Sequence, residues 1–171
     1  MGYTDVIFLL VEHGADVKKV NYYGMTSVSL AAQNGHLETI QFLVSNGCNL
    51  RTGDKAGILP LHHAAAGDHT AVVRFIIENG GSIIARTGHR KTVRHLSTRL
   101  ELTGFLVEKG ADIHARDHDG STPLHAAAGK SQAGTVSYLL NCGTDINSCD
   151  VNGHPALYFA LFEGVLLSLK F

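Results

Sequence analysis

Long apolar runs, a strong net charge and paired cysteines are all missing from this sequence of 171 residues. No apolar stretch approaches the roughly 18 residues of a membrane-spanning helix, so we expect no membrane segment. The formal net charge is -1, whereas a nucleic-acid partner would call for a basic face, so we expect no nucleic acid. Apolar residues make up 44% and charged residues 17%, which predicts a globular rather than a disordered chain.

The scarcity of cysteine bears on the cellular compartment. Cys48, Cys142 and Cys149 are an odd and sparse set, which fits a reducing environment better than a disulfide scaffold. The N-terminus lacks the basic region and cleavage site of a secretory signal, and the apolar run from Val6 to Val11 is too short for one. We therefore expect a cytoplasmic protein, with the nucleus as the alternative.

Glycine recurs at a fixed period along almost the whole chain. Five glycines each follow an apolar segment, and the spacings between them are 33, 33, 30 and 33 residues. These five are Gly14, Gly47, Gly80, Gly110 and Gly143. A second ladder, Gly24, Gly57, Gly120 and Gly153, keeps the same phase. Such a period is typical of stacked helical repeats, in which each repeat buries its apolar stripe against its neighbours.

Between these glycines the sequence resembles the ankyrin-repeat family. Asp117 to Ala128 reads Asp-His-Asp-Gly-Ser-Thr-Pro-Leu-His-Ala-Ala-Ala, and the segments Asp54 to Ala65 and Asn21 to His36 match the same pattern in part. The resemblance implies an all-α solenoid of helix-turn-helix repeats with short β-hairpin-like fingers, as a single domain over residues 1–171. Its expected repeats are 1–20 (partial), 21–53, 54–86, 87–116 (degenerate), 117–149 and 150–171 (partial).

The residues at the helix boundaries fit this architecture. Thr122-Pro123 predicts a helix start, because threonine can cap the first turn and the proline ring fixes a suitable φ. A glycine after each second helix suits the left-handed conformation of a C-cap. Each second helix also carries a large residue followed by two apolar ones, which predicts a buried stripe. These large residues are Leu9, Phe42, Phe75, Phe105 and Tyr138.

The repeat over 87–116 departs most from the pattern. Arg94 stands where a buried leucine is expected, and three residues are missing between the two helices. Gly104 lies inside the second helix, at a cost of about 1 kcal/mol relative to alanine. We expect a shortened and locally weak repeat that can uncouple the repeats on either side. Hydrogen exchange should then be fastest between Thr87 and Gly104.

The first and last repeats each show the pattern of only one helix. Residues 1–20 carry a second helix, and Gly153 to Glu163 carries a first helix. The tail from Val165 to Phe171 resembles a second helix only loosely. Two interpretations stay open: the sequence is a fragment or short form of a longer protein, or exposed apolar ends drive self-association.

Eleven histidines raise the question of a metal site. Five of them occupy ankyrin positions that usually hydrogen-bond within and between repeats: His36, His62, His69, His95 and His125. His114 and His118 fall in an extended finger, and no cysteine pair has zinc spacing. Gly129-Lys130-Ser131 ends like a phosphate-binding loop, but Leu124 replaces the first glycine of that motif. We predict no metal, no cofactor, no small-molecule substrate and no catalytic residue, hence no enzyme.

One asparagine matches a modification pattern. Ankyrin repeats, as a family, are substrates of an asparaginyl hydroxylase that favours Leu, five residues, Asp, Val or Ile, then Asn. Leu139, Asp145, Ile146 and Asn147 resemble that pattern, so the resemblance implies that Asn147 is a candidate hydroxylation site. The alternative is that Asn147 only closes a turn.

In this family partners usually lie in a concave groove lined by the fingers and the first helices. The resemblance therefore implies a protein partner that contacts variable positions on those elements. The candidate contact residues are Tyr22, Tyr23, Met25, Leu30, Lys55, Ile58, His63, Arg86, His89, Lys91, Arg116, His118 and Asp119. The first part of this set is aromatic and apolar and the middle is basic, which would suit a segment with hydrophobic anchors and acidic flanks. The leading function is a protein-interaction scaffold, and the alternative is the non-catalytic ankyrin region of a larger enzyme or ubiquitin-ligase component.

Overall fold

The computed structural model describes residues 3–97 and 99–168, and side chains from 4 to 162 apart from residue 98. The chain forms two compact blocks, Met1–Ser82 and Ile83–Phe171, which we call the N-terminal and the C-terminal block. The helices of the N-terminal block are α1 (Tyr3–Glu12), α2 (Ser27–Gln33), α3 (Leu37–Ser45), α4 (Pro60–Ala66) and α5 (Thr70–Glu78). Those of the C-terminal block are α6 (Val93–Leu96), α7 (Leu100–Glu108), α8 (Pro123–Gly129), α9 (Ala133–Asn141) and α10 (Ala156–Ser168).

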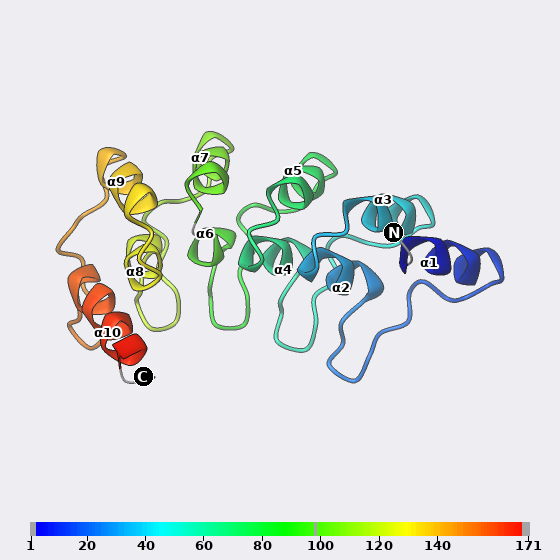
Figure 1. Cartoon of the computed structure of the whole chain (residues 1–171), viewed down its shortest axis with the longest axis horizontal. Helices are drawn as coiled ribbons and strands as arrows, with labels where there is room; N and C mark the ends of the chain where they lie inside the picture. The colour runs from blue at the N-terminus through cyan, green and yellow to red at the C-terminus, as the bar shows by residue number, and fades with distance from the viewer. Residues whose placement is uncertain (1–2, 98, 169–171) are drawn as a thin grey trace. The chain divides into compact units, whose positions relative to one another are not determined.

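Within each block the helices form two layers (Figure 1). In the N-terminal block α2 packs against α4, while α3 packs against α5 and α1. In the C-terminal block α8 packs against α6 and α10, while α7 packs against α9. Successive first helices therefore contact one another in one layer and successive second helices in the other. This arrangement confirms the all-α ankyrin solenoid that the repeat pattern predicted.

The glycine after each second helix ends that helix as predicted. Gly47 has a φ of 85°, and its N–H donates to Val44 O over 3.0 Å. The N–H of Cys48 reaches back to Leu43 O over 3.0 Å, which completes a Schellman motif. A side chain at Gly47 would be strained, because residues with a Cβ rarely adopt this left-handed conformation.

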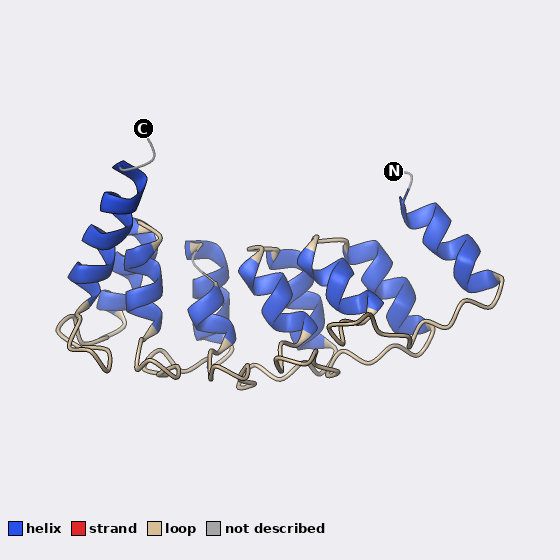
Figure 2. Cartoon of the chain, turned by 90° about the horizontal axis from the view of Figure 1, so that it is seen from below, coloured by secondary structure: helices blue, strands red, loops and turns tan. Residues whose placement is uncertain are grey.

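Each finger is a tight turn held by one side chain at its base. The Asp54 carboxylate accepts the N–H groups of Ala56 and Ile58, both over 2.9 Å. Asn21, Asp117 and Asp150 hold the corresponding turns in the same way. Three fingers also close with an isolated β-bridge, whereas Figure 2 shows no strand among the described residues.

The core of each block is a line of small and aliphatic side chains. The first helices contribute alanine pairs such as Ala64 and Ala65, which are fully buried and allow close helix contacts. The predicted stripe of large residues is confirmed only in part. Of its members Phe105 alone is fully buried, and Leu9 is exposed. The residue that follows the large one is buried in four repeats: Leu43, Ile76, Leu106 and Leu139.

The degenerate repeat is shortened, as the sequence predicts. Its first helix, α6, has only 4 residues, against 7 in α4 and in α8. Arg94 takes the buried leucine position and is 1% exposed. Gly104 lies within α7. The division between the blocks falls immediately before this repeat.

The tail differs from its expected form. The loose resemblance of residues 165–171 to a second helix is wrong for 165–168, because α10 continues unbroken to Ser168. Gly164 does not stop this helix, and no turn signal precedes the tail. Residues 169–171 lie outside the described part of the chain.

Candidate interaction surface

The tip of the first finger presents two tyrosines to solvent. Tyr22 is 83% exposed and Tyr23 is 67% exposed. Their rings meet edge to face with centroids 5.6 Å apart, and the Lys55 ammonium lies 4.3 Å from the Tyr22 ring centroid. The Asn21 side chain fixes the turn by accepting the Tyr23 N–H over 2.9 Å. A hydrogen-bonded turn thus displays an aromatic pair that is largely exposed to solvent.

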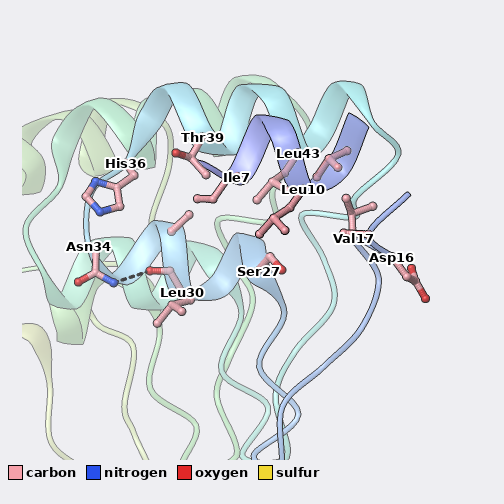
Figure 3. A pocket seen from close by; sticks show the side chains of 13 residues that line it. Ile7, Leu10, Asp16, Val17, Ser27, Leu30, Asn34, His36, Thr39 and Leu43 are labelled. Atoms are coloured by element: carbon pink, nitrogen blue, oxygen red, sulfur yellow. Dashed lines mark hydrogen bonds between the residues drawn. The ribbon is translucent and has the colours of Figure 1, made fainter. Parts of the chain in front are cut away.

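The other candidate contact residues of the N-terminal block differ in how much of their side chain a partner could reach. Leu30 is exposed and lines a cavity between α1 and α2 (Figure 3). Met25 and Ile58 are half-buried. The His63 side chain is 13% exposed, and its Nε2 lies 3.4 Å from an Asp54 carboxylate oxygen. His63 therefore supports its own finger and offers a partner less surface than the sequence suggests.

Two arginines of the predicted basic region contact neighbouring backbone. An Nη atom of Arg86 donates to the carbonyl of Arg116 over 2.9 Å, one repeat further along the chain. An Nη atom of Arg116 in turn donates to Gly120 O over 2.8 Å and to Cys149 O over 2.7 Å. Both residues are exposed, so their charge still faces solvent while part of their hydrogen-bonding capacity stabilises the stack. Arg51, which we did not predict, links repeats similarly by donating to Gly80 O over 2.8 Å.

The remaining candidates of the C-terminal block lie on its fingers. His89, His118 and Asp119 are exposed, and Lys91 is half-buried. The carbonyl of His89 accepts the N–H of His118 over 2.9 Å, which joins one finger to the next. The His118 ring nitrogen lies 3.6 Å from an Asp119 carboxylate oxygen at the exposed tip. These residues form a mixed surface of imidazole, ammonium and carboxylate groups.

The buried histidines have structural roles. His125 Nδ1 accepts the Thr122 N–H over 3.0 Å, so its Nε2 carries the proton that is donated to His154 O over 3.2 Å. His95 repeats this pattern with Thr92 and with Ser121 O. Burial lowers the pKa of both imidazoles, which favours the neutral form that these bonds require. At the start of a second helix, His69 Nε2 lies 3.0 Å from Gln33 O of the preceding repeat.

The N–H contact with the histidine Nδ1 recurs at one position in three successive repeats, at His62, His95 and His125. A model of ankyrin repeats in three copies matches residues 1–87 and 92–171. The chain belongs to the ankyrin-repeat family. The gap in the match, 88–91, is the finger of the degenerate ankyrin repeat.

Short stretches of the chain are similar to ankyrin-containing proteins of very different size. Human neurogenic locus notch homolog protein 2 is 43% identical over 63 residues, which cover 34% of this chain and 2% of that protein. Mouse protein phosphatase 1 regulatory subunit 27 is 41% identical over 58 residues, which cover 34% of this chain and 38% of that protein. Zebrafish protein fem-1 homolog C is 31% identical over 74 residues, which cover 39% of this chain and 12% of that protein. The chain thus matches well under two thirds of each relative.

The structure also places the cysteine, asparagine and possible metal-binding groups that the sequence analysis considered. Cys48 is half-buried, its thiol donates to Val17 O over 3.4 Å, and burial raises the pKa of that thiol. Asn147 is exposed, and its N–H donates to the Asp145 carboxylate over 2.9 Å. In the part of the chain that the structure describes, no three His, Cys, Asp or Glu side chains gather as a metal site would need. None of the described helices is long and apolar enough to cross a membrane.

Proposed function

We propose that this chain is a protein-interaction module whose finger tips and first helices contact the partner. The observation that carries the proposal is the exposed pair Tyr22 and Tyr23, displayed on a turn that the Asn21 side chain holds. Tyrosine buries a large area at small entropic cost and is common among interface hot spots. The ankyrin family, whose repeats generally mediate protein contacts, supports the same assignment.

The charge of the surface indicates what a partner segment contains. In the N-terminal block, Tyr22, Tyr23 and Leu30 offer apolar contacts beside the Lys55 ammonium. In the C-terminal block, Arg86, His89, Lys91 and Arg116 supply positive or titratable groups, and Arg86 and Arg116 retain exposed charge. A partner segment with aromatic or aliphatic anchors and acidic flanks would complement both surfaces. Each block is proposed to contribute its own surface.

The test compares two matched double variants in a quantitative affinity capture from cell lysate. Tyr22→Ala with Tyr23→Ala removes the aromatic pair, while Val151→Ala with Asn152→Ala changes the same finger positions four repeats later, which are also exposed. We expect proteins captured by the wild type to fall at least tenfold with the tyrosine variant and to persist with the control. Equal capture by all three chains would contradict the assignment of the site, and no specific capture by the wild type would contradict the proposed function.

A further inference from the structure

The finger of the degenerate repeat, residues 86–92, differs from the other fingers at one backbone position. In each of the other fingers a glycine with positive φ ends the turn, and its N–H donates to the carbonyl three residues earlier. These glycines are Gly24, Gly57, Gly120 and Gly153. In the degenerate finger Arg90 stands at this position, with a φ of 60° and an N–H that donates to Thr87 O over 2.8 Å. Arg90 therefore holds a left-handed conformation that glycine adopts without steric cost.

A strained residue on an exposed turn indicates a use for its side chain. Arg90 is exposed, and on the fingers that the structure describes it alone combines a side chain with a positive φ. Asp68 and Ser131 share this conformation, but they lie in the turns between the two helices of their repeats. Strained backbone of this kind clusters at sites that hold ligands. Arg90, which is not among the contact residues predicted from the sequence, is therefore a candidate for binding.

The Arg90 side chain leaves its finger beside the next finger of the same block. A Cβ built at the equivalent Gly120 would lie 3.1 Å from the Val151 nitrogen, on the finger that follows. The same register joins the degenerate finger to the next one, where the His118 N–H donates to His89 O over 2.9 Å. Arg90 thus adds a guanidinium to the row of finger turns, at a position where the other fingers carry no side chain.

The degenerate finger lies in a stretch without acidic residues. Between Glu78 and Glu101 the sequence has no aspartate or glutamate but five arginines and lysines, although the whole chain has a formal net charge of -1. These five are Arg86, Arg90, Lys91, Arg94 and Arg99. In place of the aspartate that holds three other fingers, the hydroxyl of Thr87 accepts the Lys91 N–H over 3.2 Å. The finger therefore lacks the carboxylate that would offset its cations.

The cations of this finger are available to a ligand. Arg90 is exposed and Lys91 is half-buried, and within the described residues neither side chain forms an ion pair with a carboxylate. Arg86 is exposed as well, and one of its Nη atoms donates to the carbonyls of Arg90 and Arg116. These carbonyls are neutral acceptors, so the charge of Arg86 is left without a counterion.

We propose that the degenerate finger binds a peptide segment with alternating carboxylates, and that Arg90 is the residue that selects it. This inference rests on the proposed function and gives the chemistry of one contact within it. Residues of an extended peptide rise about 3.3 Å each, so every second side chain lies on one face, about 6.6 Å from the next. Successive carboxylates can therefore meet successive cations along a single finger. A guanidinium can donate two parallel N–H groups to one carboxylate, which favours an aspartate or glutamate side chain at Arg90.

The surrounding charges favour a peptide over a nucleic acid. Asp112, Asp119 and Asp145 are exposed in the same block, and Asp119 lies on the turn next to the degenerate finger. A nucleic acid carries a phosphate at every nucleotide and binds through several cations along its backbone, so these carboxylates would repel it. A short acidic segment can engage one finger and avoid them.

The test is fluorescence anisotropy with the 171-residue chain and a short rhodamine-labelled peptide that alternates glutamate and serine. We expect Arg90→Gly to weaken binding by about fivefold, which is the upper range for one exposed ion pair. The same variant should raise the thermal midpoint, because glycine relieves the backbone strain. Arg90→Lys keeps the charge and the strain, so it should lose less affinity than Arg90→Gly and gain no stability. An Arg90 with a purely structural role would change stability without changing affinity.

Two further variants and a second peptide serve as controls. Lys130→Gln removes an exposed cation of the same block away from the fingers and should bind like the wild type, whereas Asp119→Asn should tighten binding by removing a nearby carboxylate. A peptide with glutamine in place of glutamate should not bind. Equal affinity of the wild type and Arg90→Gly, or equal binding of the two peptides, would overturn the proposal, as would tighter binding of a labelled oligothymidylate of the same length. Tyrosine-dependent capture from lysate without binding of the acidic peptide would overturn this inference and leave the proposed function intact.

Discussion

Arg94 occupies the repeat position that Leu124 holds one repeat later, and both side chains are 1% exposed. Leucine at this position packs against aliphatic neighbours of the core, as Leu124 does with Ala127 and Leu139. The guanidinium of Arg94 has no hydrogen-bond partner for Nε or for either Nη atom within the described residues. Burial in low-polarity surroundings disfavours the charged form and lowers the pKa of this guanidinium.

Replacing Arg94 with leucine should therefore stabilise the protein. The substitution removes a buried charge without partners and restores the side chain that the position accepts in other repeats. We expect the free energy of unfolding of the C-terminal block to rise by about 2 kcal/mol, from the usual cost of unsatisfied buried polar groups.

Urea unfolding followed by circular dichroism measures the change. The control is Lys130→Leu, which removes an exposed cation from the same block and should change stability by less than about 0.5 kcal/mol. If Arg94→Leu instead destabilised the protein, the Arg94 guanidinium would have to make a stabilising interaction in the folded state.

Gly104 offers a second route to a more stable degenerate repeat. It lies inside α7 without a positive φ, and a Cβ built there meets no heavy atom within 4 Å. Gly104→Ala should stabilise the protein by about 1 kcal/mol, because alanine loses less backbone entropy in a helix. Amide hydrogen exchange should be fastest between Thr87 and Gly104 in the wild type and slower there in the variant. Uniform protection across both blocks of the wild type would show that this repeat is not the weak point.

The sequence predicts the repeats well because their signals are local. The glycine after each second helix and Thr-Pro before a first helix act through their own φ angles and caps, so the helix ends near Gly47 and Thr122 follow directly. The guanidinium contacts of Arg86 and Arg116 depend on distances across repeats, which spacing alone does not give. The continuous α10 was missed because the repeat pattern favours a first helix that ends near Glu163, whereas the helix runs on through Gly164 to Ser168. For the candidate surface, the sequence identified Tyr22 as variable, but its exposure required the structure.

Hydroxylation of Asn147 is the next prediction. Asn147 is exposed on the loop after α9, whereas Leu139 of the same pattern is buried within α9. Co-expression with the asparaginyl hydroxylase should add one oxygen to the intact mass, and tandem mass spectrometry should place it on Asn147. Asn147→Ala should abolish the addition. Asn152 is also exposed but lacks the preceding leucine, aspartate and isoleucine pattern, so Asn152→Ala should leave the addition unchanged. An unmodified wild-type mass would contradict the prediction.

Stability should fall as the pH is lowered through the ordinary histidine range, because His95 and His125 are buried in neutral form. Burial lowers the pKa of both imidazoles below the value of about 6.5 that they have in the unfolded chain. At pH values well above 6.5 both imidazoles are neutral in the folded and in the unfolded state, so they contribute no pH dependence there. Below pH 6.5 these two imidazoles bind protons in the unfolded chain but stay neutral in the folded chain. The free energy of unfolding therefore decreases with falling pH until the folded-state pKa is reached.

His125→Gln separates this titration from the hydrogen bonds of the residue. The glutamine oxygen can accept the Thr122 N–H, and its amide can donate toward His154 O, but it does not titrate. Urea unfolding from neutral to mildly acidic pH should therefore show a shallower loss of stability for His125→Gln than for the wild type. His114→Gln removes an exposed imidazole of the same block and should leave the wild-type slope unchanged. Equal slopes in all three proteins would show that His125 takes up its proton as readily in the folded state as in the unfolded state, and that its contacts with Thr122 and His154 do not depend on the neutral form.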